Sequence, residues 1–265
     1  MKAAPYRVCF IDSGIGGLSI YEAFRTLAPY VDTIYCADYS FFPYGTKTEE
    51  ALLDRMLALV DKLSALHPFD LLVIPCNTAS TLILDVLRQK VSFPVVGTVP
   101  AIKTAGQASH SKVIGILATK GTVSRAYTKK LEDEFASDCT VVRCGSSRLV
   151  ELAEDKFQGI PISISEVKKE VHPLLSDKNL DTVVLACTHF SFIKEELGSC
   201  LDRLVQWVDS TVAVANRALS LLPKDVSSTN KIGASIFIST STSIPRKLER
   251  ILREKYAFEV EKIDF

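Results

Sequence analysis

The sequence predicts an α/β protein with two pseudo-symmetric domains, each a mostly parallel sheet flanked by helices. Short apolar runs, β-branched in part, alternate with longer amphipathic stretches, which is typical of successive βαβ units. One pattern also occurs twice, because residues 73–80 and 184–191 are both apolar runs that end in a cysteine followed by polar residues. A helical pattern follows each of them, so each cysteine is expected at a strand-to-helix turn.

The individual elements follow from the periodicity of the apolar residues. Strands are predicted over residues 7–11, 33–37, 71–75, 112–118, 140–143 and 182–186. Helices with an apolar face are predicted over residues 18–28, 49–66, 80–89, 123–135, 148–157, 165–175 and 212–221. These helices supply the right-handed crossovers that parallel strands require. A last strand over residues 234–238 and a helix over residues 245–255 do not form a third unit.

The repeat extends beyond the cysteines and predicts the domain boundaries. Each half opens with a strand that ends in a small or polar turn, at Ser13 and at Thr119. Cys76 follows Ser13 by 63 residues and Cys187 follows Thr119 by 68 residues, so the halves have similar lengths. Glycine and proline in residues 97–100 predict a hinge. We therefore expect a first domain of residues 1–98 plus about 209–265, and a second domain of residues 99–208.

The amino-acid composition limits the kinds of molecule that the protein is expected to bind. The 265 residues are 47% hydrophobic and 23% charged, which is ordinary for a globular protein of about two domains. Basic and acidic residues balance at 31 each, so no net charge attracts nucleic acid or an anionic membrane. No stretch resembles a signal peptide or a membrane span. The protein is therefore expected to be cytoplasmic, and its seven cysteines, an odd number spread through apolar runs, predict reduced thiols.

Two of the cysteines have a distinctive setting, whereas the other five have the environment of buried structural thiols. Cys76 and Cys187 are each expected at the start of a helix, where the helix dipole favours the thiolate over the thiol. Ligands of α/β folds bind at the carboxyl ends of the strands, where these thiols should lie. Two matched thiols suit racemisation, because one proton must leave a carbon and another must arrive on the opposite face.

Residues 12–17 form a glycine-rich turn between a strand and a helix, whose N–H groups can bind an anion such as a carboxylate. A turn in which Asp12 or Ser13 caps the helix explains the same pattern. The spacing departs from the dinucleotide motif G-x-G-x-x-G, although Asp38 is within reach of the acidic position of that motif. Nucleotide binding is therefore disfavoured.

Metal and redox chemistry have weaker support. Cys187 and His189 provide at most two zinc ligands, with no second cluster of that kind. A redox pair of Cys76 with Cys187 would lack the Cys-x-x-Cys motif. No metal and no cofactor are expected. His189, two residues after Cys187, is the one histidine that we single out, and the alternative is that it only satisfies the start of the helix.

Six ordered blocks, residues 12–19, 42–45, 76–80, 97–103, 117–123 and 187–190, resemble those of the aspartate/glutamate racemase family. The likeness covers nearly the whole chain and is strongest to the glutamate racemases. It implies cofactor-independent, two-base interconversion of L- and D-glutamate for peptidoglycan synthesis, with the active site in the cleft between two domains. It also implies a small-molecule substrate, no nucleic-acid or membrane partner, and a homodimer.

The resemblance assigns roles to individual residues. Cys76, assisted by Asp12, would take the α-proton from D-glutamate. Cys187, assisted by His189 and Glu151, would take it from L-glutamate. The residues implied in binding the ammonium and carboxylate groups are Asp12, Ser13, Tyr44, Gly45, Asn77, Thr78, Thr119, Thr122, Thr188 and His189.

Three positions depart from the family pattern, which has glycine before the second cysteine and Pro-Leu further on. These are Ala186, Ser191 and Phe192. A slight displacement of Cys187 and weak activity would follow, because a shift of about 1 Å can cost roughly a hundredfold in rate. Thr98 also departs from the pattern, but is expected to lie away from the chemistry. The alternatives are a racemase of another amino acid such as aspartate, and a racemase-like binding or inhibitory protein with weak catalysis.

Overall fold

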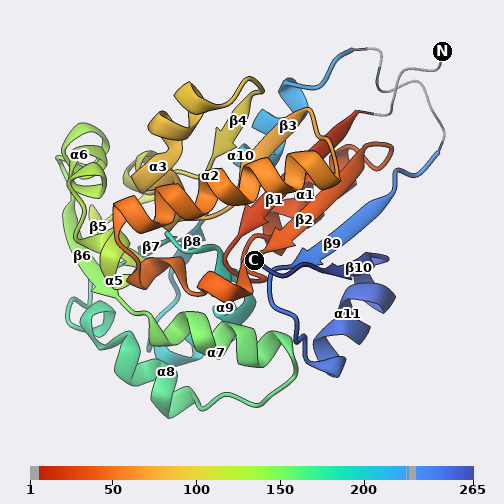
Figure 1. The fold of residues 1–265 in the computed structure, drawn as a ribbon. Helices are drawn as coiled ribbons and strands as arrows, with labels where there is room; N and C mark the ends of the chain where they lie inside the picture. Colours follow the sequence, from red (N-terminus) through yellow and green to blue (C-terminus); the bar gives the residue numbers. More distant parts are fainter. Residues whose placement is uncertain (1–5, 225, 227–230) are drawn as a thin grey trace. The chain divides into compact units, whose positions relative to one another are not determined.

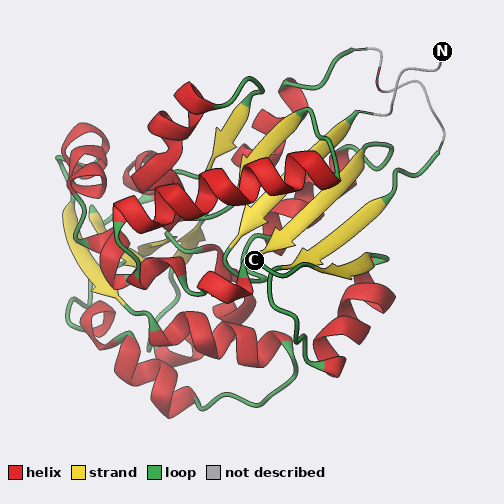
Figure 2. Cartoon of the chain, viewed as in Figure 1, coloured by secondary structure: helices red, strands yellow, loops and turns green. Residues whose placement is uncertain are grey.

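The fold was analysed in a computed structural model, which describes residues 6–224, 226 and 231–265. The chain divides into two compact units, one made of Met1–Thr98 and Thr211–Phe265 and the other of Val99–Ser210. Each unit contains one parallel sheet with helices packed against it (Figures 1 and 2). The predicted α/β class is confirmed.

The first unit has a six-stranded sheet in the order β10-β9-β2-β1-β3-β4, and all neighbouring strands are parallel. Its central strands are apolar on both faces because helices cover both of them. The strands are β1 (Arg7–Asp12), β2 (Asp32–Ala37), β3 (Leu71–Ile74), β4 (Val95–Gly97), β9 (Ser235–Ser239) and β10 (Glu259–Lys262).

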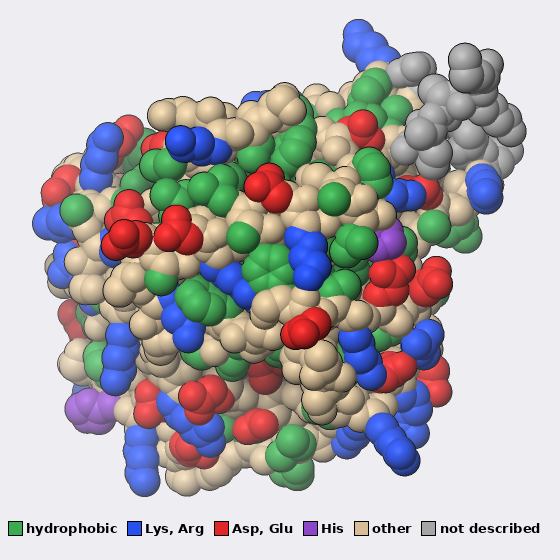
Figure 3. Space-filling view, viewed as in Figure 1, with side chains coloured by type: hydrophobic (Ala, Val, Ile, Leu, Met, Phe, Trp, Pro, Cys, Tyr) green, Lys and Arg blue, Asp and Glu red, His purple; other side chains and the backbone are tan. Residues whose placement is uncertain are grey.

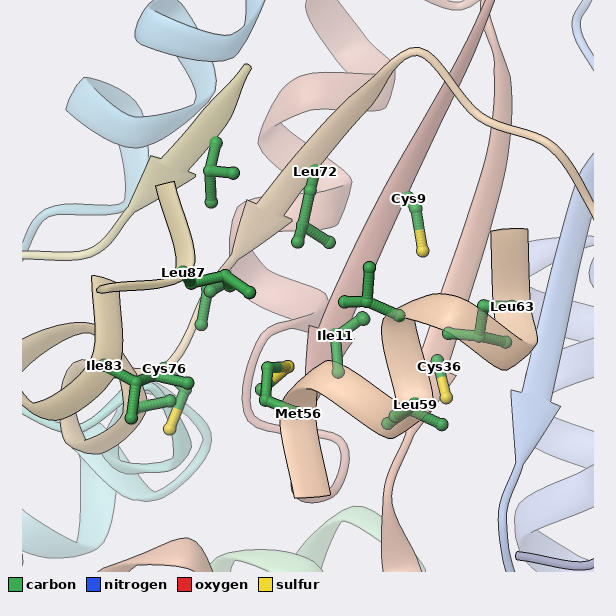
Figure 4. Close-up of a cluster of buried hydrophobic side chains, with 14 of the residues drawn as sticks. Cys9, Ile11, Cys36, Met56, Leu59, Leu63, Leu72, Cys76, Ile83 and Leu87 are labelled. Carbon is green, nitrogen blue, oxygen red and sulfur yellow. The ribbon is translucent and has the colours of Figure 1, made fainter. Parts of the chain in front are cut away.

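The helices of this unit are α1 (Leu18–Leu27), α2 (Glu49–Leu66), α3 (Asn77–Lys90), α10 (Thr211–Ser220) and α11 (Arg246–Tyr256), with the 3₁₀ turns η1 (Tyr39–Phe41) and η2 (Tyr44–Thr46). Helix α2, the long orange helix of Figure 1, packs its apolar side against the sheet. Figure 4 shows Leu59 and Leu63 of α2 near Cys9 and Cys36, whereas Cys76 lies at the other end of this cluster beside Ile83.

The second unit has a four-stranded parallel sheet in the order β6-β5-β7-β8. Its strands are β5 (Val113–Ala118), β6 (Thr140–Gly145), β7 (Thr182–Leu185) and β8 (Gln206–Val208). Its helices are α4 (Ile102–Ala108), α5 (Lys120–Val123), α6 (Ala126–Phe135), α7 (Arg148–Phe157), α8 (Ile164–Glu170) and α9 (Lys194–Cys200), with η3 (His172–Leu175) and η4 (Thr188–Ile193). The order β6-β5-β7-β8 repeats β2-β1-β3-β4 of the first unit, so the sequence repeat corresponds to a repeat of topology.

Some elements differ from those predicted. Strands β4, β8 and β10, of three or four residues each, were not predicted. The helix predicted over residues 123–135 is interrupted at Arg125, whose backbone is extended. The helix predicted over residues 165–175 ends at Glu170, and Pro173 lies in the 3₁₀ turn that follows.

The surface agrees with the balanced composition. Lys, Arg, Asp and Glu side chains are interspersed on the face shown in Figure 3. None of the helices in the described part of the chain combines the length and the apolar character that a membrane crossing needs.

Asp181 connects the loop after α4 to the start of β7. Its carboxylate accepts hydrogen bonds from the Ser109 hydroxyl at 2.6 Å, from the backbone of His110 and Ser111 at 2.9 and 2.8 Å, and from the Thr182 hydroxyl at 2.9 Å. Burial acts to raise the pKa of Asp181, but the hydrogen bonds outweigh it and hold the pKa below its ordinary value. The ionised form is therefore favoured by folding.

We predict that Asp181→Asn lowers the free energy of unfolding at pH 7 by about 1 kcal/mol, since solvent screens this partly exposed carboxylate. Because the pKa of Asp181 is lower in the folded protein, its contribution to stability is complete above the pKa of the unfolded state, about 3.9. The contribution is lost as the pH falls through the pKa of the folded state. The difference from the wild type should thus shrink below about pH 4. Urea unfolding, followed by the fluorescence of the single tryptophan Trp207, measures this difference in the free energy of unfolding. The control is Asp133→Asn, which changes an exposed carboxylate in the same way. A difference independent of pH would contradict the assignment.

Candidate active site

When continued past the last paired residues, the strand register brings each candidate cysteine level with the hydroxyl residue that follows the neighbouring strand. Val8 of β1 pairs with Leu71 of β3, and continuing this register places Ser13 opposite Cys76. Ile114 of β5 pairs with Thr182 of β7, which in the same way places Thr119 opposite Cys187. Both positions are at the carboxyl ends of strands where the strand order reverses, which is the usual ligand position of open α/β sheets. The structure therefore contains two equivalent candidate half-sites, one in each unit.

The turn after β1 is organised by Asp12. The fully buried carboxylate of Asp12 accepts hydrogen bonds from the backbone N–H groups of Ser13 and Gly17, both at 2.6 Å. These two N–H groups were expected to be available for an external anion, but they bind the side chain of Asp12. Gly17 also lies so close to Pro75 that a Cβ atom would come within 2.3 Å of the proline ring. The Asp12 turn therefore packs directly against the residue that precedes Cys76.

Cys76 is the N-cap residue of α3, with extended backbone and a mostly buried side chain. Asn77 and Thr78 follow in the first turn of α3, and both are 3% exposed. In the described chain, Oδ1 of Asn77 is the one buried side-chain oxygen or nitrogen that lacks a hydrogen-bond partner. A buried acceptor without a donor is costly, and so it fits a donor that a ligand supplies.

Tyr44 and Gly45 lie in η2, and the hydroxyl of Tyr44 is engaged within the protein. It donates to Asp38 at 2.9 Å, and Asp38 also accepts from Arg55 and from the Thr240 hydroxyl. Burial, together with the Asp38 charge, raises the pKa of Tyr44 well above its ordinary value, so the hydroxyl stays protonated.

The surroundings of Asp38 also concern the alternative of a bound dinucleotide. The carboxylate of Asp38 is fully buried and already accepts four hydrogen bonds, so it does not offer an acceptor to a ribose. Over the described ranges, no three His, Cys, Asp or Glu side chains gather closely enough to hold a metal ion.

Cys187 is supported by a histidine and a glutamate. The thiol sulfur lies 4.0 Å from Nδ1 of His189, and Nε2 of His189 lies 3.0 Å from Oε1 of Glu154. A carboxylate only accepts hydrogen bonds, so Nε2 donates to it and Nδ1 is directed toward the thiol. All three side chains are buried, which keeps this Cys–His–Glu chain largely out of water.

The glutamate in this chain is Glu154 and not the predicted Glu151. The side chain of Glu151 is 49% exposed and pairs with Arg148, whereas that of Glu154 is 8% exposed and contacts His189. The two glutamates are three residues apart on α7, and only Glu154 lies on the helix face that carries the buried Val150. Helical periodicity was the signal that distinguishes them, since Glu154 follows Val150 by one turn.

The threonines of the second unit form their own hydrogen bonds. Thr119 caps α5, where its hydroxyl accepts from the backbone of Thr122 at 3.3 Å and donates to the hydroxyl of Thr122 at 3.0 Å. Thr188 follows Cys187 directly and is buried. Sequence reasoning missed Arg125, whose guanidinium donates to Thr122 at 3.3 Å and brings a positive charge to this half-site. The extended backbone of Arg125, which interrupts the predicted helix, places it there.

The three departures from the family pattern have separate surroundings. The methyl group of Ala186 is buried in a core cluster with Ile102 and Val184. The ring of Phe192 packs edge-on against Phe157 at 5.1 Å between ring centres, and Ser191 lies beside it on a surface pocket. These substitutions are accommodated by packing within the second unit.

The remaining thiols have different surroundings from the two candidates. All seven cysteines are free. Burial raises the pKa of Cys9 and Cys36 far above the ordinary value and that of Cys144 to about 12, which keeps these thiols protonated and inert. They agree with the structural role inferred from their apolar sequence context.

Comparison with known proteins identifies the class to which this fold and these half-sites belong. The family model described as Asp/Glu/Hydantoin racemase matches residues 17–218. The chain belongs to this racemase family, as its motifs predicted.

The similar proteins are more specific. The glutamate racemase of Pasteurella multocida is 49% identical over 83% of each chain, and that of Photorhabdus laumondii is 47% identical over 83% of this chain and 77% of its own length. The crystal structure of Escherichia coli glutamate racemase in complex with L-glutamate and the activator UDP-MurNAc-Ala matches with a TM-score of 0.89 and 40% identity, covering 98% of this chain and 99% of its own.

We predict that Glu154→Gln slows alkylation of Cys187 by iodoacetamide at pH 7.5 by about three- to tenfold. The reason is that the hydrogen bond from Nε2 to the Glu154 carboxylate orients the His189 ring, whose Nδ1 lies beside the thiol that must lose its proton. The matched variant Glu151→Gln should react as the wild type does, because Glu151 is paired with Arg148 at the surface. Peptide mass spectrometry resolves Cys187 from the other thiols. Equal slowing in both variants would remove Glu154 from this role.

Proposed function

We propose that this protein is a glutamate racemase that interconverts L- and D-glutamate by two-base proton transfer and supplies D-glutamate for peptidoglycan synthesis. The observation that carries this proposal is the repeated half-site, in which Cys76 and Cys187 each follow the strand that pairs with the first strand of their unit. Two thiols in equivalent positions suit a reaction whose two directions are mirror images. The relatives named as glutamate racemases support the choice of substrate.

In the direction from D- to L-glutamate, the thiolate of Cys76 removes the α-proton. The electron pair that remains on the α-carbon is delocalised into the adjacent carboxylate. The thiol of Cys187 then donates its proton to the opposite face, so the reaction ends with Cys76 as thiol and Cys187 as thiolate. That state is the starting point for L-glutamate, and no external acid or base is consumed. The mechanism requires both thiols to reach one α-carbon from opposite sides.

The surrounding groups have roles that suit their hydrogen bonds. His189, held by Glu154, exchanges a proton with Cys187 through Nδ1. Asp12 assists Cys76 from the turn that packs against Pro75. The unpartnered Oδ1 of Asn77 accepts a hydrogen bond from the substrate ammonium. The groups proposed to bind the carboxylates are the hydroxyls of Ser13, Thr78, Thr119, Thr122 and Thr188, the backbone at Tyr44 and Gly45, and the guanidinium of Arg125.

The alternatives have less support. Racemisation of aspartate would use the same thiols, but the similar proteins at 41% to 49% identity are named glutamate racemases. A binding or inhibitory protein with weak catalysis would not require the buried Cys187, His189 and Glu154 to be in contact. The homodimer and the cytoplasmic location expected from the sequence stay predictions.

We predict that the purified protein exchanges the α-proton of both enantiomers of glutamate in D₂O, with inversion of configuration. Proton NMR follows the loss of the α-proton signal, and optical rotation follows the inversion. Aspartate should show neither under the same conditions. If folded, reduced protein exchanged neither enantiomer of glutamate, the proposed function would be wrong.

We further predict that Cys76→Ser and Cys187→Ser each lower turnover in both directions by at least about a hundredfold, because each removes one of the two proton-transfer groups. Cys139→Ser, which replaces a partly buried thiol outside the half-sites, is the control and should keep wild-type activity. Coupled detection of the product enantiomer measures the rates. Near-wild-type turnover in either half-site variant would exclude the two-base assignment.

A further inference from the structure

Two hydroxyl groups next to Cys76 have no role in the proposed mechanism. Oγ of Ser80 donates to the backbone oxygen of Ile74 at 3.1 Å and accepts from the backbone N–H of Thr98 at 2.8 Å. Oγ1 of Thr98 donates to the same oxygen of Ile74 at 3.0 Å. Ile74 is the last residue of β3, two residues before Cys76. The expectation that Thr98 lies away from the chemistry is therefore wrong, because it binds the strand end that carries Cys76.

These bonds lie in the interior of the first unit. Ile74 and Thr98 are fully buried, and Ser80 is nearly so. Glycine at position 97 permits the contact, since a Cβ atom there would come within 2.4 Å of Leu84 and 3.0 Å of Oγ of Ser80. Buried hydrogen bonds of this kind fix the geometry of the groups that they join, because water cannot replace either partner. The end of β3, the first turn of α3 and the end of β4 are thus held together.

The hydrogen bonds of Ser80 hold the backbone both before Cys76 and at Cys76 itself. The backbone N–H of Ser80 donates to the backbone oxygen of Cys76 at 2.9 Å, while the side chain of Ser80 holds Ile74. One residue therefore constrains both the segment before the thiol and the residue that bears it. Cys187 is held in another way, by a tighter turn in which Phe190 N–H donates to its backbone oxygen at 3.1 Å, and by the side chain of His189.

We propose that Ser80, together with Thr98, is a positioning residue for the thiol of Cys76. This proposal rests on the proposed racemase function. Loss of these hydrogen bonds lets the segment from Ile74 to Cys76 move. Proton transfer slows when the thiol shifts away from the α-carbon. Only the proton transfers made by Cys76 are slowed, because the bonds are confined to the first unit. Those made by Cys187 keep their rates.

The test compares kinetic isotope effects in the two directions for Ser80→Ala. Initial rates are measured with D- and L-glutamate carrying hydrogen or deuterium at the α-carbon. Because enantiomers have equal free energies, kcat/KM falls equally in both directions, by about tenfold. The isotope effect should rise with D-glutamate, since proton removal by Cys76 becomes limiting. It should fall with L-glutamate, since the limiting step becomes proton donation by Cys76.

Controls distinguish a positioning role of Ser80 from a loss of folded enzyme. A smaller fraction of folded enzyme lowers the rates but leaves both isotope effects unchanged, and that result would overturn the proposal. Thr98→Val removes a single hydroxyl at nearly constant volume. It should shift both isotope effects in the same directions as Ser80→Ala, by a smaller amount. This variant provides the test if Ser80→Ala does not fold. Ser191→Ala, the matched change four residues after Cys187, should leave both isotope effects unchanged. Failure of the proposed function is distinguishable, because the wild type would then not racemise glutamate.

Discussion

The register between the first and third strands of each sheet is the constraint on which the site depends. In a parallel sheet all carboxyl ends lie at one edge, and the strand order opens a crevice beside the first strand. The pairing of β1 with β3 and of β5 with β7 then brings the turns that begin with Ser13 and Thr119 to the same sheet edge as Cys76 and Cys187. The repeat in sequence therefore accompanies a repeat of topology, with similar distances of 63 and 68 residues from the first turn to the cysteine.

The two half-sites reach similar positions for their thiols by different means. Cys76 is the N-cap of an α-helix of 14 residues, and the hydroxyl of Ser80 holds the strand end that precedes it. Cys187 begins a 3₁₀ segment, and the titratable pair of His189 and Glu154 supports it. An imidazole can accept or donate a proton beside the thiol of Cys187, whereas the hydrogen bonds of Ser80 fix the backbone on either side of Cys76. Equivalent placement in the fold thus does not imply the same supporting side chains.

Sequence reasoning was most successful where a residue's position follows from local periodicity. The fold class and the strand-to-helix turns at Cys76 and Cys187 follow from apolar runs that end in polar residues. Glu151 was the predicted partner of His189, but the contact is made by Glu154, because a family likeness does not say which face of α7 meets His189. The hydrogen bonds of Ser80 could not be predicted, because they join three segments that are brought together only by the folded sheet.

The pairing of β2 with β9 has a consequence for the order of events during synthesis on the ribosome. Thr33 and Ser235 are hydrogen-bonded although 202 residues separate them. The second unit, a continuous segment, can complete its sheet while β9 and β10 are still unmade. Until then β2 is an open strand edge, of the kind that invites pairing with other chains. The nascent protein therefore exposes this edge until residues 235–239 have emerged.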